Sequence, residues 1–486
     1  MPIATLDLVL LVLYVASTVA FGLWMGRGQR SAQDYLLGGR DLPWGVLLLS
    51  IVATETSTVT FLSLPGVAYF GDLRFLQLPL GYIVGRAIAA TVMVPQYFRG
   101  ELFTAYDVLR VRSGPHVRTL ASAIFLVTRT VADGLRLFLT AIVLQVMFGW
   151  ELSGAVIAVG AATVVYTVIG GIKAVVWTDA IQFFVYMAGA AIAFFVMHDK
   201  LDGGLGAALS GEGAAERLRV FALEWDLAES YTLWAGLIGG AVLSIGSHGV
   251  DQLIVQRFLC ARSQRDAQRA LFWSGPVVLG QFAIFLLLGV GLAGFYAQFP
   301  PQTPFAKSDR VFADFIVNQL PTGVVGVVLG ALFSAAMSTL SSSLSASASA
   351  LVNDFVLPMT RHARDSRFAL RAAKAATVLF ATLQILVGVT GLGLDPDEPV
   401  IGQVLAIQNL NLGMLLGLFA LALGKRRSAK ASLVGLLGGL AMTLWIVFFK
   451  PSVGWPWLGV MTCSATVLVG RAALVITGPR DLTPAR

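Results

Sequence analysis

Ionisable residues lie within several apolar stretches of the sequence. Glu55 follows the run SIVAT, and Arg129, Asp133 and Arg136 lie inside the stretch 119–147. A charged side chain at the centre of a lipid bilayer costs at least about 2.5–3.5 kcal/mol, so such residues usually bind a ligand or pair with one another. The i, i+4 and i+7 spacing of the last three places them on one helix face. Two arginines against one aspartate leave a positive excess that can receive a carboxylate.

A second segment is rich in small hydroxyl residues. The sequence ALFSAAMSTLSSSLSASASALVND lies within the apolar run 320–356, and its serines share one helix face. They are Ser338, Ser341, Ser342, Ser345 and Ser349. Two interpretations are open. The small residues allow close helix contact, with hydroxyls bonded back to their own helix, or hydroxyls and unwound carbonyls form a site for a hard cation such as Na⁺.

The composition predicts the class of protein whose helices hold these residues in place. Of 486 residues, 57% are hydrophobic and 13% are charged, with a mean hydropathy of +0.79. Soluble domains carry about 25% charged residues, so the sequence predicts an all-α integral membrane protein in a lipid bilayer. The net charge of +7 comes from Lys and Arg in short loops, where they set topology. Nucleic acid is therefore not an expected partner.

Thirteen apolar runs are long enough to be transmembrane helices, since a spanning helix needs roughly 20 residues. Their approximate bounds are 4–25, 41–69, 73–97, 119–147, 151–171, 177–197, 231–258, 271–297, 320–356, 368–393, 398–424, 430–449 and 456–477. The first run has no positive charge before it and is too long for a signal-peptide core. It is expected to remain as a span.

Positive charge recurs in every second loop between these runs. One such cluster begins at Arg257, and the intervening loops, such as 198–230, are short or acidic. The bias of Lys and Arg toward cytoplasmic loops places the N-terminus outside and the C-terminus in the cytoplasm. Short loops without a targeting peptide favour a bacterial inner membrane.

Ten of the runs divide into two sets of five, 41–197 and 231–424. A set with an odd number of spans reverses direction at its repeat, so the two halves are expected to be inverted in the membrane, as in many secondary transporters. One extra N-terminal helix (4–25) and two extra C-terminal helices (430–477) complete a single transport domain over residues 1–486.

Each half contains a candidate helix break. In the first half it is SIVATETSTVTFLSLPG (50–66), where Thr and Ser surround a carboxylate, and in the second it is SIGSHGVDQ (244–252). Polar interruptions at corresponding positions of two halves point to a binding site near the middle of the membrane.

With these motifs, the chain resembles the sodium:solute symporter family, which includes sodium/glucose, sodium/proline and sodium/sialic acid symporters. The matching segments, in order, are DYLLGGR (34–40), SIVATETS (50–57), GGIKAVVWTDAIQ (170–182), IVQR (254–257) and ALFSAAMSTLSSSL (331–344). The resemblance covers nearly the whole length. It implies a leucine-transporter-type 5+5 inverted-repeat fold of 13 transmembrane helices.

The resemblance also implies a Na⁺ site between the first and eighth core helices. Its ligands would be the backbone carbonyls of Ala53, Thr56 and Ala335 with the hydroxyls of Ser338 and Thr339. Some members bind a second sodium ion. The matching positions here are Asp179, Ser338, Ser341 and Ser342. A helix cap is the alternative role for Asp179.

The family's solute pocket is lined by the first, second, third, sixth and tenth core helices. With the charged residues above, this predicts as solute contacts Glu55, Ser57, Gln77, Arg129, Asp133, Arg136, Ser244, His248 and Gln408. A structural ion network is the alternative for the charged set, and a buried hydrogen-bonded role is the alternative for His248. Ser247 replaces the aromatic gate residue expected in sugar carriers, which weakens a sugar assignment.

The resemblance implies Na⁺-coupled symport of a small organic solute by alternating access, with a carboxylate-bearing solute favoured. Three alternatives are a proton-coupled carrier with Glu55 or Asp179 titrating, a Na⁺ symporter for sugars or polyols, and a membrane sensor acting through a separate partner. The sequence contains neither a phosphate-binding loop nor a catalytic triad, and its two cysteines lie far apart. A primary pump or an enzyme is therefore not expected.

Overall fold

The computed structural model describes residues 4–100, 102–210, 213–301, 303–360, 366–390, 400–449 and 451–477. Within these ranges the regular structure is helical, and an isolated bridge joins Leu42 to Ala261. Nine helices of the described ranges are long and apolar enough to cross a membrane, or eleven when each of two bent pairs counts as one span. The all-α prediction is confirmed.

The principal helices follow the predicted apolar runs. They are α1 (Thr5–Met25), α3 (Trp44–Glu55), α4 (Thr58–Phe70), α5 (Gln77–Ile88), α6 (Val94–Tyr97), α8 (Pro115–Phe148), α9 (Leu152–Lys200), α12 (Gly240–Gly249), α13 (Gln252–Leu259), α14 (Gln264–Gln298), α16 (Val324–Leu351), α18 (Ser366–Thr390), α19 (Val400–Leu423), α20 (Ala429–Phe449) and α21 (Trp455–Thr477). Shorter helices connect them, namely α2 (Ala32–Leu37), α7 (Asp107–Ser113), α10 (Gly204–Ser210), α11 (Ala214–Arg217), α15 (Ser308–Gln319) and α17 (Leu357–Met359). Part of the predicted loop charge, in 361–365 and 391–399, lies outside the described residues.

Two elements differ from the predicted runs. The 49-residue helix α9 joins the runs 151–171 and 177–197, and Gly171 bends it with a φ of 55°, a left-handed value that glycine adopts without a steric penalty. The short helix α15 begins at Ser308, between the predicted apolar runs 271–297 and 320–356, so apolar run length did not predict it.

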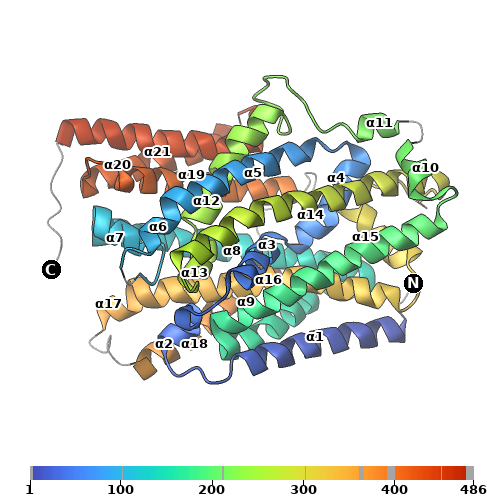
Figure 1. The fold of residues 1–486 in the computed structure, drawn as a ribbon, viewed down its shortest axis with the longest axis horizontal. Helices are drawn as coiled ribbons and strands as arrows, with labels where there is room; N and C mark the ends of the chain where they lie inside the picture. Colours follow the sequence, from blue (N-terminus) through green and yellow to red (C-terminus); the bar gives the residue numbers. More distant parts are fainter. Residues whose placement is uncertain are drawn as a thin grey trace.

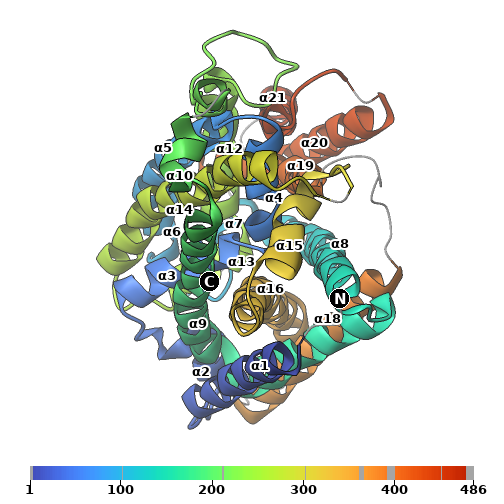
Figure 2. The same cartoon turned by 90° about the vertical axis from the view of Figure 1, so that its right-hand side faces the viewer.

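Helix α16 lies at the centre of the bundle. Figure 2 shows it nearly end-on, with α1, α9, α15 and α18 around it, and α9 and α1 pack against it. Every residue from Val328 to Ala350 is buried. Its many Ser, Ala and Gly residues are small enough to let several helices approach it closely. The serine-rich run is therefore a core helix.

The outer helices expose apolar side chains. Leu13 on α1, Phe195 on α9 and Leu468 on α21 are 57%, 73% and 67% exposed. Most helices run along the long axis of the molecule, with α1 and α20–α21 on opposite sides of the bundle (Figure 1). Apolar side chains on the outside of a bundle with a polar interior are typical of lipid-facing surfaces.

Both predicted helix breaks are present. The chain bends by 65° between α3 and α4 and by 54° between α12 and α13. Ser57 starts α4 as a capping box with Thr60, and the Asp251 side chain accepts a hydrogen bond from the backbone of Leu253 at the start of α13. These caps satisfy amide groups that a break would otherwise leave unpaired.

Candidate functional site

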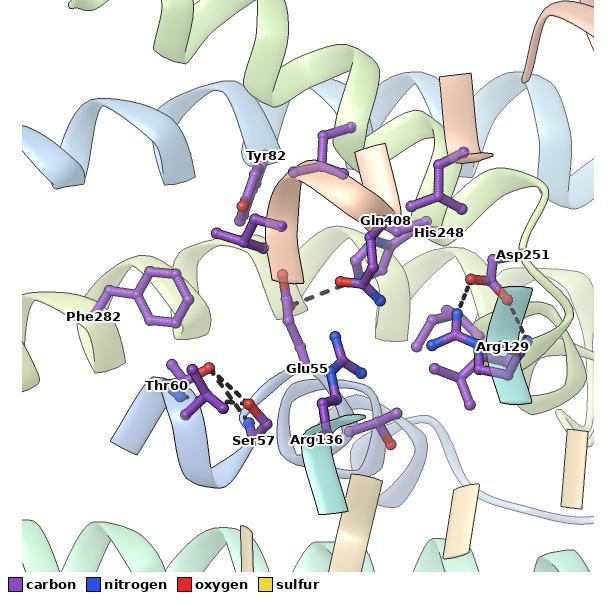
Figure 3. A pocket seen from close by; sticks show the side chains of 18 of the residues that line it. Glu55, Ser57, Thr60, Tyr82, Arg129, Arg136, His248, Asp251, Phe282 and Gln408 are labelled. Atoms are coloured by element: carbon purple, nitrogen blue, oxygen red, sulfur yellow. Dashed lines mark hydrogen bonds and ion pairs between the residues drawn. The ribbon is translucent and has the colours of Figure 1, made fainter. Parts of the chain in front are cut away.

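A pocket lies where the two broken helices meet α8, α14 and α19. Its empty volume is about 850 Å³, including space open to solvent. Figure 3 shows its polar wall. The structure brings six of the predicted solute contacts to this wall: Glu55, Ser57, Arg129, Arg136, His248 and Gln408.

Glu55 forms one end of the charged wall. It is the last residue of α3 and forms an ion pair with Arg86 of α5, whose side chain is fully buried. The second Nη of that guanidinium donates to the Ser274 hydroxyl at 2.9 Å. Nε2 of His248 lies 3.8 Å from the Glu55 carboxylate and has no hydrogen-bond partner. Arg86, which does not line the pocket, thus neutralises the charge of Glu55. The Glu55 side chain still lines the pocket.

Two arginines of α8 form the other part of the wall. Arg129 is paired with Asp251, the cap of α13, and lies 3.6 Å from Asp133. Arg136 donates through Nη1 to Asp133 at 3.0 Å, and its Nε has no partner. The three predicted residues of α8 therefore do share one face, and Arg136 keeps donor capacity toward the pocket.

The predicted positive excess is wrong because Asp251 supplies a second carboxylate. Three guanidinium groups and three carboxylates surround the pocket within the described ranges, and each guanidinium has a carboxylate partner. The formal charges sum to zero. The interpretation of these charged residues as a structural ion network is therefore correct for the three ion pairs. Arg136 still has an Nε–H group without a hydrogen-bond partner.

A smaller pocket adjoins the first. Ser57 and Arg136 line both, and Thr339 of α16 lines only the smaller one. Asp133 also lies on its wall. The solute wall and the predicted Na⁺ ligands are thus neighbours.

The predicted Na⁺ ligands lie at one seam between α3 and α16. Ala53, Ala335 and Ser338 are fully buried. The Thr339 hydroxyl lies 3.4 Å from the Thr54 carbonyl at the C-terminal end of α3, next to the break at Thr56. A helix break exposes carbonyl oxygens that no amide of the same helix uses, so this seam offers neutral oxygen ligands.

Asp179 lies beside this seam in the middle of α9. Ser338 donates to its Oδ1 at 2.8 Å, and Ser342 lies 3.3 Å from its Oδ2. Ser341 instead donates to the Ser338 carbonyl at 3.2 Å. Three of the four residues predicted for a second sodium site are therefore together, and the capping role for Asp179 is wrong because the residue lies far from either end of α9.

Arg257 was expected in a cytoplasmic loop, and this is wrong. It lies within α13, is fully buried, and places Nη2 2.9 Å from Asp179. Its guanidinium also bonds Ser50, Thr54 and Ser342. The bend before α13 carries this residue into the bundle, where it neutralises a buried carboxylate.

The rest of the serine face of α16 packs against α13. The Gln256 side chain donates to Ser345 at 3.3 Å, and Gln252 donates to Ser349 at 3.4 Å. The two interpretations of the serine segment thus apply to different parts of it. The first half faces the seam, and the second half forms helix contacts.

Two predicted solute contacts lie elsewhere. Gln77 donates to the Tyr231 carbonyl at 2.9 Å and accepts from the Ala222 amide at 3.0 Å. Ser244 donates to the Tyr82 carbonyl at 3.1 Å. Both are on predicted helices but hold backbone segments together, and neither lines a pocket described above.

The pocket also contains residues that the sequence did not predict. Asp251, Tyr82, Phe75 and Phe282 line it. The first could have been found, because it is a carboxylate within the apolar run 231–258 and the argument applied to Glu55 holds for it too. The aromatic side chains carry no comparable signal, since aromatic residues also occupy the core and the exposed apolar surface among the described residues.

Known proteins are similar to this chain in sequence and in fold. A profile of the sodium:solute symporter family matches residues 35–439. The chain is 27% identical over 430 residues to sodium-coupled monocarboxylate transporter 1 of Xenopus laevis, covering 87% of this chain and 68% of the relative. It is 27% identical over 448 residues to the sodium/sialic acid symporter NanT of Aliivibrio fischeri, covering 91% and 88%.

A solved structure of a Na⁺-coupled sialic acid symporter, in a substrate-bound outward-open state, has a similar fold. The TM-score is 0.89 with 24% sequence identity, and the alignment covers 99% of this chain and 100% of that chain. At this identity the comparison establishes the arrangement of the helices.

Proposed function

Because this chain belongs to the sodium:solute symporter family, we propose that it carries a small carboxylate monoanion together with Na⁺. The chain is an integral, multi-pass membrane protein and a transporter rather than an enzyme, and Na⁺ is its coupling ion. The relatives named above carry monocarboxylates and sialic acid. The residues of the pocket must therefore indicate which solute this chain carries.

The observation that carries this proposal is the position of Arg136. Its Nη1 holds Asp133, its Nε has no partner, and it lines both the large pocket and the small pocket that reaches Thr339. A guanidinium has five N–H donors in a planar fork that matches a carboxylate. A solute carboxylate at this position completes the hydrogen bonding of Arg136 and lies next to the proposed ion.

Charge compensation supports a monoanion. The charged groups around the pocket form three balanced pairs, and the proposed Na⁺ ligands are neutral oxygens. A Na⁺ ion at the seam adds one positive charge in a region of low dielectric, where an uncompensated charge is strongly unfavourable. One carboxylate beside it restores neutrality.

The proposed Na⁺ ligands are the carbonyls of Ala53, Thr56 and Ala335 and the hydroxyls of Ser338 and Thr339. Na⁺ bound there joins the end of α3 to α16, and the same α3–α4 break presents Glu55 and Ser57 to the solute. Ion and solute then stabilise one arrangement of the break, so each raises the affinity of the other. Release of Na⁺ into a cytoplasm of low Na⁺ weakens solute binding, which drives alternating access.

The second sodium site remains a prediction on Asp179, Ser338, Ser341 and Ser342. The carboxylate is already paired with Arg257, and Ser341 bonds the Ser338 carbonyl. A second Na⁺ at Asp179 therefore requires this guanidinium to release the carboxylate. We propose that coupling rests on the first site.

We also propose the finer architecture. The runs 41–197 and 231–424 form two inverted repeats of five helices, with 4–25 and 430–477 as additional helices, giving 13 transmembrane helices in one transport domain. Support comes from the bent helices α3–α4 and α12–α13, which begin the two halves. The bias of loop charges supports an outside N-terminus and a cytoplasmic C-terminus in a bacterial inner membrane.

The test is thermal stability of the purified chain in detergent. The protein is heated in matched Na⁺, K⁺ and choline salts, with monocarboxylates, dicarboxylates, sugars, polyols and amino acids added in turn. A ligand at 100 times its Kd adds about 2.7 kcal/mol to the free energy of unfolding. A rise in Tm that requires Na⁺ and is enlarged by monocarboxylates supports the proposal. Enlargement by sugars or polyols, with no effect of carboxylates, contradicts it.

A further inference from the structure

Glu55 and His248 face each other across a gap. Glu55 ends α3 and His248 lies in the last turn of α12, so each belongs to a different broken helix. Nε2 of His248 and Oε2 of Glu55 are 3.8 Å apart, which is too long for a hydrogen bond. The His248 side chain is 2% exposed, and its Nε2 has no partner. Figure 3 shows both residues on the pocket wall.

The neighbours of His248 determine which ring nitrogen carries the proton. The Ser247 hydroxyl lies 2.7 Å from Nδ1 and 3.5 Å from the Ser244 carbonyl. When this hydroxyl donates to Nδ1, the shorter of its two contacts, the ring proton lies on Nε2. A carboxylate on the Nε2 side favours the same tautomer. The pocket therefore presents an N–H donor and a carboxylate acceptor side by side.

One hydroxyl group matches this pair. An oxygen atom with two hydrogen bonds of about 2.8 Å at a near-tetrahedral angle holds its partners about 4.6 Å apart, so a hydroxyl enters the 3.8 Å gap when the two side chains separate by roughly 0.8 Å. We infer that Glu55 and His248 form a hydroxyl-binding subsite, so the solute is a hydroxylated carboxylate. This inference rests on the proposed function, because Arg136 is expected to hold the carboxylate. The solute hydroxyl accepts from Nε2–H and donates to Glu55.

A hydroxyl group is favoured over an ammonium group by the surrounding charge. Arg86 already pairs with Glu55 and donates to Ser274 behind it. An ammonium group would face that guanidinium, and the pocket has no unpaired carboxylate within the described residues to compensate it. A neutral hydroxyl adds no charge. By bridging α3 and α12, it also links the two broken helices.

The experiment compares closely matched solutes on the full-length chain in saturating Na⁺. Apparent Kd values are measured from thermal stability for butanoate, for its 2-, 3- and 4-hydroxy derivatives, and for 4-aminobutanoate. At least one hydroxy derivative is expected to bind about tenfold or more tightly than butanoate, because a site built to bond a hydroxyl leaves its groups unpaired with the deoxy analogue. The isomer that binds tightest gives the spacing between the two subsites.

Variants of His248 test whether this residue causes the preference for hydroxybutanoate over butanoate. His248→Leu is expected to lower the ratio of hydroxybutanoate to butanoate affinity to about one, and because both affinities are measured on the same variant, a general loss of carboxylate binding cancels in the ratio. His248→Gln keeps an N–H donor and should retain part of the preference. His116→Leu, at an exposed histidine near the start of α8, is the matched control and should leave the ratio unchanged.

The outcomes separate this inference from the proposed function. Equal binding of butanoate and all its hydroxy derivatives overturns the hydroxyl subsite but leaves carboxylate symport intact. Preference for 4-aminobutanoate also overturns it and assigns the gap to an ammonium group. Binding of none of these carboxylates in Na⁺ overturns the proposed function itself.

Discussion

The seam between α3 and α16 and the pocket beside it are neighbours with opposite chemistry. The proposed ligands at the seam are carbonyl and hydroxyl oxygens of Ala53, Thr56, Ala335, Ser338 and Thr339. The pocket instead carries three arginine–carboxylate pairs. The buried carboxylate beside the seam, Asp179, bonds Ser338 and is paired with Arg257, so Na⁺ at the proposed neutral ligands meets no uncompensated anion and can leave. Paired charges let the pocket stay free of uncompensated charge before the solute arrives.

Under the proposed function, this difference makes the binding of the ion depend on the binding of the solute. The seam offers Na⁺ coordination but no net negative charge among its proposed ligands, and the pocket offers a carboxylate site at Arg136 with no net positive charge around it. Each ligand supplies the charge that the other lacks. The comparison predicts that variants that break a buried charge pair have the largest effects, and that variants of the neutral ligands at the seam have moderate effects restricted to Na⁺.

The largest expected effect is on the Arg257–Asp179 pair beside the seam. Arg257→Gln should lower the free energy of unfolding by about 3–5 kcal/mol, because it leaves Asp179 buried without a partner. The double variant Arg257→Gln/Asp179→Asn should recover much of the loss. Denaturation in detergent measures both. The control Arg110→Gln, at an ion pair whose arginine is 48% exposed, should change stability by about 1 kcal/mol or less.

A single Arg257 variant as stable as the unmodified chain would contradict the pairing. In that case Asp179 would be available to a cation from solution, and the seam would no longer be a neutral region.

The second largest effect is expected on the affinity for the solute. Arg136→Ala should weaken carboxylate binding by about 100-fold, since truncating one member of a buried charge pair costs about 2–5 kcal/mol. The affinity for Na⁺ alone should change less than about threefold. Arg136→Lys keeps the charge but not the planar fork and should lie between. Titration of each ligand against thermal stability separates the two affinities, and an equal loss of both would favour a purely structural arginine.

The sequence predicted the helices and their breaks well because the signals are local. Apolar length identifies a spanning helix wherever it packs, and the polar segments 50–57 and 244–252 interrupt that length visibly. The Ser57 cap, three residues before Thr60, is a further local signal. The spacing of the serines in α16 predicted their common face, although not which helix each half of that face contacts.

The charge partners could not be predicted in the same way. Arg129 and Asp251 are 122 residues apart, and Arg257 and Asp179 are 78 apart. Their pairing depends on how far each bend carries α13 into the bundle, which no local pattern encodes. Counting charges along α8 alone therefore gave a positive excess that the folded protein does not have.

Helix membership also did not determine which way a side chain faces. Gln77 lies on α5, as the solute prediction required, but its amide holds the Tyr231 and Ala222 backbones. Ser244 lies one helical turn from His248 and yet bonds the Tyr82 carbonyl. The rotation of each helix about its axis decides these contacts, and that rotation is a tertiary property.

A moderate effect is expected at the seam. Ser338→Ala and Thr339→Ala should each raise the Na⁺ concentration for half-maximal uptake by about tenfold, since one lost polar contact costs about 1–1.5 kcal/mol. The solute affinity at saturating Na⁺ should remain. Ser347→Ala is the matched control, because this buried serine of α16 has a hydroxyl without a partner. Unchanged Na⁺ dependence in the first two variants would remove the site from the seam.

The smallest expected effect is that of the membrane potential. One Na⁺ with one monocarboxylate carries no net charge, so uptake into proteoliposomes should change by a factor near one when a potential of 100 mV is imposed with K⁺ and valinomycin. A second Na⁺ at Asp179 would move one net charge, worth about 2.3 kcal/mol at that potential, or about a 50-fold change in the accumulated solute at equilibrium. If such a change is observed and Asp179→Asn abolishes it, Arg257 must release its carboxylate during transport. Asp179 would then belong to a second ion site, and the contrast between a neutral set of Na⁺ ligands and a charged pocket would hold for only one of the two ions.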